Sequence, residues 1–126
     1  MAKLNAVNRV EELAQKYSGQ CEVTRPLTAS KESPNLSFME IEIRPGNSNN
    51  VVVVELVENK NNSLGAQLIA VKYLNGEYTD ESPESLFEAL DGILSGKIAE
   101  KKTLFGFGQK KYVVTGQSGK EYWPRD

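Results

Sequence analysis

Histidine is absent from this 126-residue sequence, and cysteine occurs only once. The lack of histidine excludes a Ser-His-Asp catalytic triad and zinc sites of the Cys₂His₂ or His₃ type. It also leaves no imidazole for general acid–base catalysis. Cys21 alone makes neither an internal disulfide nor a structural zinc or iron–sulfur site. These absences lead us to predict no cofactor and to favour a non-catalytic protein over an enzyme.

Long apolar segments are also missing. The N-terminal stretch MAKLNAVNRVEEL has no apolar run of signal-peptide length. The longest apolar runs, Val51–Val54 and Leu68–Val71, are far shorter than the roughly 20 residues of a membrane-spanning helix. Together with the single cysteine, this predicts a cytoplasmic protein that does not enter a membrane.

The charges nearly balance over the whole chain but are distributed unevenly along it. Lys and Arg number 15 and Asp and Glu number 17, so the net charge is −2. Residues 1–96 hold 8 basic and 14 acidic residues, a net charge of −6, whereas residues 97–126 hold 7 and 3, a net charge of +4. This separation indicates that the C-terminal third presents a basic surface.

Two segments have the spacing of amphipathic helices. Apolar residues three and four positions apart predict a helix over residues 3–17, with Gly19 just past its end. A second helix is predicted over residues 83–95. Ser82 is suited to its N-cap, Pro83 to its first position and Gly96 to its C-terminal stop.

Strands are predicted between and after these helices, and residues 25–35 are predicted to be a loop. Four consecutive valines favour a central strand covered on both faces. Asn75-Gly76 is typical of a two-residue hairpin turn, which would place Tyr73 opposite Tyr78. The predicted strands are Cys21–Thr24, Leu36–Arg44, Val51–Val57, Ala66–Leu74 with a hairpin partner after Gly76, Thr103–Phe107, Lys111–Thr115 and Lys120–Trp123.

This order predicts a single small α+β domain. We expect a mainly antiparallel sheet of about five to seven strands and two helices, in the order α-β(3-4)-α-β(2-3). The turns between residues 44 and 64 are too short for a parallel crossover.

Known catalytic motifs do not occur. GILSGK (92–97) and GQSGK (116–120) are too short for a phosphate-binding loop and lack its final hydroxyl residue, and Ser118 is not in a GxSxG motif. Glu40 and Glu42 lie roughly 7 Å apart on the wet face of a predicted strand. This spacing would suit a two-carboxylate hydrolase only by coincidence, and we attribute it to a solvated strand face. The acidic residues around the start of the second helix are explained by the helix dipole.

The best candidate site is the basic C-terminal region, where aromatic residues alternate with lysines. We predict that the partner-binding residues are Lys101, Lys102, Phe107, Lys110, Lys111, Tyr112 and Trp123. The lysines would guide association, and the rings would anchor the partner.

Three functions are compatible with this pattern. The first is a protein-binding module, such as an adaptor, a chaperone-like protein or an inhibitor, whose partner would be acidic. The second is a single-stranded nucleic-acid binder that uses the same residues, with lysines on phosphates and rings on bases. The third is a small-ligand carrier or carboxylate-based enzyme, which would need a concave apolar pocket. We favour the first, and nothing in the sequence specifies the oligomeric state.

Overall fold

The computed structural model describes residues 5–46, 49–61, 65–74, 76–79, 82–102 and 110–125. Within these residues there are two helices and eight strands, which confirms the predicted α+β class. In chain order they are α1 (Asn5–Lys16), β1 (Gln20–Ala29), β2 (Leu36–Arg44), β3 (Val52–Asn59), β4 (Gln67–Tyr73), β5 (Gly76–Tyr78), α2 (Pro83–Leu94), β6 (Ile98–Lys102), β7 (Lys110–Thr115) and β8 (Glu121–Tyr122). Neither helix is long and apolar enough to span a membrane.

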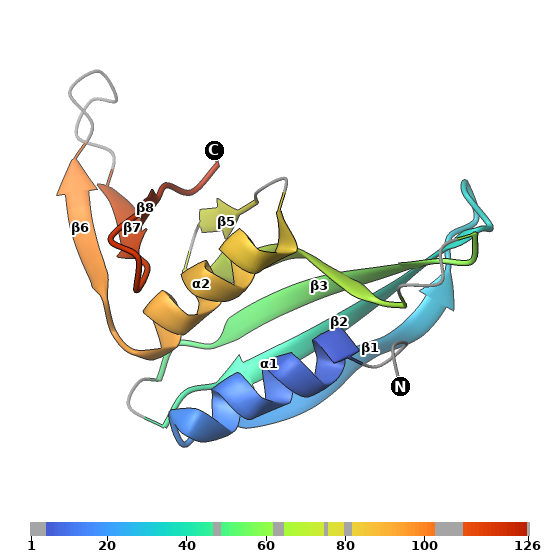
Figure 1. Ribbon diagram of the computed structural model, residues 1–126, viewed down its shortest axis with the longest axis horizontal. Helices are drawn as coiled ribbons and strands as arrows, with labels where there is room; N and C mark the ends of the chain where they lie inside the picture. Colours follow the sequence, from blue (N-terminus) through green and yellow to red (C-terminus); the bar gives the residue numbers. More distant parts are fainter. Residues whose placement is uncertain are drawn as a thin grey trace.

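The strands form two antiparallel sheets. The larger has the order β1-β2-β3-β4-β5 and the smaller the order β6-β7-β8. Helices α1 and α2 lie side by side on one face of the larger sheet, and the smaller sheet stands beyond α2 (Figure 1). The core fills the space between the helices and this face. Its fully buried members include Val10 of α1, Leu86, Leu90 and Leu94 of α2, and Ile41, Val54 and Val71 of the sheet.

Strand β1 is longer than predicted, because residues 25–29 continue it instead of beginning a loop. All ten of its residues are exposed, so the strand lacks the alternation of apolar and polar residues that marks a half-buried strand. Pro26 is tolerated because β1 is an edge strand, where a missing N–H need not break a pairing. Its pairing with β2 shifts register between Val23 and Arg25 and again between Arg25 and Thr28.

Strand β3 is the central strand of the larger sheet, as the valine run predicted. Its valines are not covered on both faces, however. Val52 and Val54 are fully buried under the helices, whereas Val53 on the other face is only half-buried and Val51 is exposed. One face of the sheet therefore remains accessible, and we refer to it below as the open face.

The β4–β5 hairpin lies one residue earlier than predicted. Tyr73 pairs with Gly76, and Tyr78 pairs with Val71, so the two tyrosines are not opposite each other. Leu74 adopts a positive φ of 54°. Position 76 needs a glycine because a Cβ there would lie 2.6 Å from the Pro124 side chain.

The ends of α2 follow the predicted signals closely. Ser82 is the N-cap, Pro83 is the first helical residue, and Gly96 follows the C-cap with a φ of +81°. After α1 the residue with a positive φ is Ser18 (58°), not Gly19.

Strand β6 was not predicted. Its sequence, IAEKK, has one large apolar residue and no clear alternation, but it pairs in register with β7 from Ile98–Val114 to Lys102–Lys110. The predicted strand Thr103–Phe107 lies outside the described residues, since residues 103–109 are not among them. The last two predicted strands are confirmed as β7 and β8, the latter shortened to two residues.

Candidate partner-binding surface

The register of the β6–β7 hairpin places lysines directly opposite one another. Lys101 pairs with Lys111, and Lys102 pairs with Lys110. Like charges at directly opposed positions of an antiparallel pair destabilise it. The Lys101–Lys111 pair therefore places two positive charges next to each other on this hairpin.

The alternation of side chains along a strand places Lys101 and Lys111 on one face of the small sheet and Lys110 on the other. Lys101 and Lys111 share one face with Glu121 and Trp123, and we call these four residues the basic face. Val113, on the same side of the sheet, is buried and gives this face an apolar base. The opposite face carries Val114 and Tyr122, which pack into the core.

On the basic face, Lys101 is the central residue. Its Nζ lies 2.8 Å from Glu121 Oε2 and 5.6 Å from the centroid of the Trp123 ring. The hydrogen bond from Lys101 holds the pKa of Glu121 below its ordinary value. Trp123 is 48% exposed, which is unusual for so large an apolar ring. Because exposed ion pairs contribute little, Lys101 can exchange Glu121 for another carboxylate at small cost.

The structure brings together three of the seven predicted site residues. Lys101, Lys111 and Trp123 share the basic face, whereas Lys110 and Tyr112 alternate onto the other face. There Lys110 Nζ lies 3.3 Å from Glu100 Oε1, and the Tyr112 carbonyl accepts a hydrogen bond from Tyr78. Glu121 was missed as a member of the site, because its position beside Lys101 depends on the pairing of β7 with β8.

The other two predicted residues are not placed on either surface. Phe107 lies outside the described residues, and for Lys102 only the backbone pairing is described.

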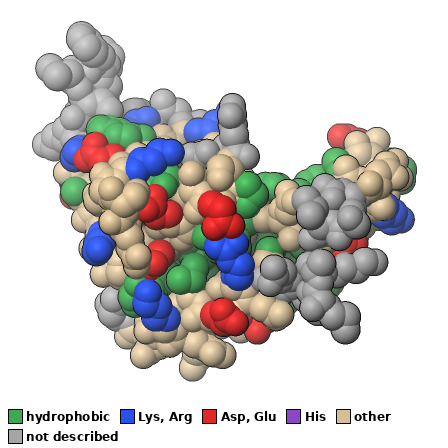
Figure 2. Space-filling model, viewed as in Figure 1, with side chains coloured by type: hydrophobic (Ala, Val, Ile, Leu, Met, Phe, Trp, Pro, Cys, Tyr) green, Lys and Arg blue, Asp and Glu red, His purple; other side chains and the backbone are tan. Residues whose placement is uncertain are grey.

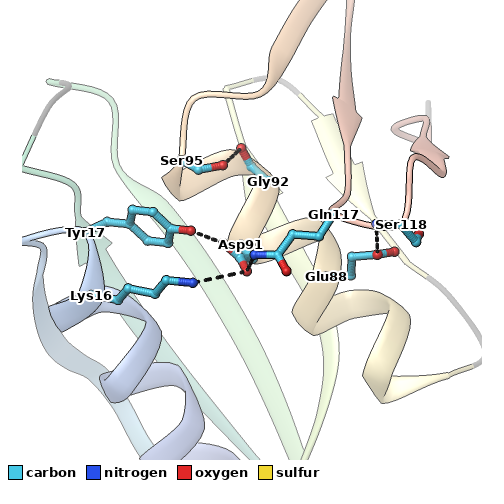
Figure 3. Close-up of polar contacts among 8 residues, drawn as sticks. All are labelled: Lys16, Tyr17, Glu88, Asp91, Gly92, Ser95, Gln117 and Ser118. Carbon is cyan, nitrogen blue, oxygen red and sulfur yellow. Dashed lines mark hydrogen bonds and ion pairs between the residues drawn. The ribbon is translucent and has the colours of Figure 1, made fainter.

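A second polar cluster joins the two helices to the turn between β7 and β8. Asp91 accepts hydrogen bonds from the Tyr17 hydroxyl and from Gln117 Nε2 at 2.9 Å, and Lys16 Nζ lies 3.9 Å away (Figure 3). One carboxylate of α2 is thus in contact with the end of α1 and with the 116–119 turn.

Glu88 lies one helical turn before Asp91 on α2 and holds the 116–119 turn between β7 and β8 in place. Its carboxylate accepts the backbone N–H of Ser118 at 2.8 Å and the hydroxyl of Tyr122 (Figure 3 shows the Ser118 contact). A Cβ on Gly116 would lie 2.4 Å from the Glu88 side chain, so a glycine is needed for this close approach. The bonds from Ser118, followed by that from Tyr122, keep the pKa of Glu88 below its ordinary value.

This cluster has the properties of a structural contact. A groove of about 240 Å³ runs along it, lined by side chains of α1, α2 and the turn, among them Arg9, Glu84 and Phe87. Arg9 donates two hydrogen bonds to Glu84, at 2.7 and 2.9 Å, and its guanidinium lies 3.8 Å from the centroid of the Phe87 ring. A lowered pKa keeps Glu88 ionised, which is the wrong state for a general acid near neutral pH.

Other features usually associated with catalysis are weak in the part of the chain that the structure describes. There, no group of three or more Cys, Asp or Glu residues is arranged to hold a metal ion. Cys21 is exposed, but desolvation by neighbouring atoms, followed by the charge of Glu11, raises its pKa, the opposite of what activates a thiol. A groove of about 510 Å³ beside Cys21 is lined mainly by polar residues and backbone of α1 and the start of β1, unlike an apolar ligand pocket.

No protein-family model, curated protein or solved structure matches this chain.

Proposed function

We propose that this chain is a cytoplasmic, non-catalytic protein-binding module that captures an acidic partner through the basic face. The observation that carries the proposal is the direct opposition of Lys101 and Lys111 beside the exposed ring of Trp123. Local arrangements that are unfavourable for folding, such as two lysines opposite each other, tend to occur at functional sites. A carboxylate-bearing partner could contact both lysines at once.

The composition of the basic face suits a protein interface. Tryptophan is enriched among the residues that dominate binding energy, and lysines around such an anchor guide the approach of an acidic surface. The exposed ring of Trp123 supplies the apolar area of the face, since Val113 beneath it is buried. The partner would therefore present carboxylates around an apolar contact for Trp123.

Single-stranded nucleic acid suits this surface less well. Binding of that kind depends on several exposed rings on which successive bases stack. Among the described residues, Trp123 is the one exposed aromatic ring, since Tyr112 is half-buried and Tyr122 is buried. Glu100 and Glu121 also stand among the lysines and would repel phosphates.

Affinity capture from a native extract tests the proposal. The immobilised proteins would be wild type, the Lys101→Gln, Lys111→Gln variant, and a control with Lys31→Gln and Lys60→Gln. The two control lysines are exposed and lie near the opposite end of the molecule, after β1 and β3 (Figure 1). We expect one stoichiometric protein to be retained by wild type and control and lost from the basic-face variant.

Two other results would contradict the proposal. Retention of the same protein by all three baits would show that the basic face is not the interface. Retention of no protein, together with binding of single-stranded oligonucleotides whose affinity falls steeply with salt, would identify a nucleic-acid binder instead.

A further inference from the structure

The open face of the larger sheet also places like charges opposite one another, here of negative sign. Glu22 of β1 pairs with Glu42 of β2, and Glu40 of β2 pairs with Glu55 of β3. Both pairs point to the side away from the helices, because Ile41 and Ile43, which alternate with Glu40 and Glu42, are buried in the core. Like charges at directly opposed positions repel each other, and Arg25, which pairs with Glu40, and Lys72, which is bonded to Glu55, offset part of this repulsion.

The pairing of strands arranges the middle of the open face in three rows that cross the sheet, and the row beside the first contains Gln20 and Arg44. The first row contains Glu22, Glu42, Val53, Lys72 and Glu77, the second contains Arg25, Glu40, Glu55 and Ala70, and the third contains Thr28, Phe38, Val57 and Gln67. The first two rows together hold five glutamates against one lysine and one arginine, a net charge of −3. Acidic and apolar side chains therefore lie next to each other over four strands.

Three of these glutamates each make a polar contact through one carboxylate oxygen. Lys72 Nζ lies 2.6 Å from Glu55 Oε1, and Arg44 Nε lies 3.1 Å from Glu42 Oε1, while the Thr24 hydroxyl donates to Glu40. The hydrogen bond to Glu55, together with the nearby charges of Glu55, Glu77 and Glu40, raises the pKa of Lys72, which reflects the negative potential of the open face.

The helix-covered side of the molecule is different. There, basic and acidic side chains alternate over the surface, and Figure 2 shows them next to one another. Arg9 with Glu84 and Lys16 with Asp91 are examples of such opposite-charge pairs. Like-charge opposition in the larger sheet thus occurs on the face that the helices leave uncovered.

We propose that the open face binds a basic segment of a second protein, with cationic side chains over the Glu22–Glu42 and Glu40–Glu55 pairs. Apolar side chains of the same segment would contact Phe38, Val53 and Val57, each of which is half-buried. A metal ion does not fit, because no described group of acidic residues is arranged to ligate one. The surface is separate from the basic face, so the module would join an acidic partner and a basic one.

The probe for this proposal is a synthetic peptide of alternating Lys and Val residues, with a Glu and Val peptide as its matched control. Titration into isotope-labelled protein would be followed by nuclear magnetic resonance at low ionic strength, where the Debye length is about 30 Å. We expect the Lys peptide to shift resonances of β1, β2 and β3, and the Glu peptide to shift none of them.

A charge-neutralising variant locates the binding site. Glu22→Gln, Glu40→Gln and Glu42→Gln together should weaken binding of the Lys peptide about tenfold, the effect of losing three exposed ion pairs. The control variant Glu11→Gln, Glu12→Gln, Glu32→Gln has the same net charge but changes α1 and the loop after β1, and it should bind as wild type does.

Several results would overturn the proposal. They are equal affinities for the two variants, shifts confined to residues outside the open face, or no binding of the Lys peptide. Self-association of the free protein that the open-face variant abolishes would also overturn it, because the occupant would then be a second copy of this chain. None of these results depends on the basic face, so the two proposals fail separately.

Discussion

The hydroxyl of Tyr78 donates a hydrogen bond to the backbone carbonyl of Tyr112, and this contact links the larger sheet to the smaller one. Tyr78 belongs to β5 and is 1% exposed, and Tyr112 belongs to β7. A second link lies nearby, where the N–H of Arg125 bonds to the carbonyl of Glu77 at 2.7 Å. The orientation of the basic face relative to the open face therefore depends on β5 as well as on the contacts of α2 with β7 and the 116–119 turn.

The first prediction concerns the ionisation of Tyr78. Desolvation by burial, with a smaller contribution from Tyr73, raises the pKa of Tyr78 from 10.0 to about 12. The unfolded chain loses this proton near pH 10 while the folded chain keeps it. Stability that is fully present below pH 10 is therefore lost as the pH rises towards 12. Ultraviolet titration should show one tyrosine that ionises near pH 12.

The Tyr78→Phe variant assigns that titration. It should lack the late-ionising tyrosine and lose less stability than wild type between pH 10 and 12. A wild-type titration in which every tyrosine ionises near pH 10 would contradict the prediction.

The second prediction concerns the close approach of α2 to β7. A Cβ on Gly92 would lie 2.6 Å from Val114 Cγ1 and 2.7 Å from the Thr115 carbonyl oxygen. Although alanine is the better helix former, Gly92→Ala should lower the free energy of unfolding by about 1–3 kcal/mol, the usual cost of overpacking. Urea denaturation would measure it. Ser85→Ala in the same helix is the control and should be neutral or stabilising, and a stabilising Gly92→Ala would contradict the prediction.

The sequence predicts those elements whose signals are local. The alternation of Met39, Ile41 and Ile43 with charged residues marks β2, and the Ser82-Pro83 start and Gly96 end mark α2. Strand β1 and strand β6 carry no such pattern. The exposed β1 needs no apolar face, and β6 is fixed by its pairing with β7.

The candidate site was predictable in composition but not in arrangement. Charge counting finds the basic C-terminal third. The opposition of Lys101 to Lys111, and of Glu40 to Glu55, depends on strand registers, which are set by long-range pairing. The bulge between Glu55 and Leu56 shifts the pairing of β3 with β4, so the register cannot be obtained by counting residues from a turn.

The third prediction concerns the acid stability of the β7–β8 turn. Hydrogen bonds from Ser118 and Tyr122 lower the pKa of Glu88 below its ordinary value of 4.5. Because the folded-state pKa is lowered, the stabilisation is present above pH 4.5 and is lost as the pH falls towards the folded-state value. Glu88→Gln should therefore melt below wild type at pH 7, and the difference should shrink below pH 4.5. A difference that is independent of pH would show that the charge of Glu88 is not responsible.

The fourth prediction concerns the cost of charge repulsion on the open face. Removing the charge of Glu22, which lies opposite Glu42, should raise the free energy of unfolding by about 0.2–1 kcal/mol. Urea denaturation of Glu22→Gln would measure the gain, with the exposed loop substitution Glu32→Gln as control. A loss of stability on Glu22→Gln would mean that Glu22 is held by favourable contacts and that the face is not strained by its charge.

The last prediction separates the two kinds of residue on the basic face by their effect on binding kinetics. Lys111 acts at a distance, so Lys111→Gln should slow association with the captured partner and reduce its dependence on salt, with little change in the dissociation rate. Trp123 acts by contact, and an interface anchor contributes about 2 kcal/mol or more, so Trp123→Ala should weaken binding about 30-fold through faster dissociation. Surface plasmon resonance at several salt concentrations distinguishes these effects. Trp123 is exposed and belongs to no helix or strand, so its loss should leave the backbone signal in far-ultraviolet circular dichroism unchanged. If both variants changed only the association rate, and by the same factor, Trp123 would not contact the partner. The basic face would then act only through long-range electrostatic attraction.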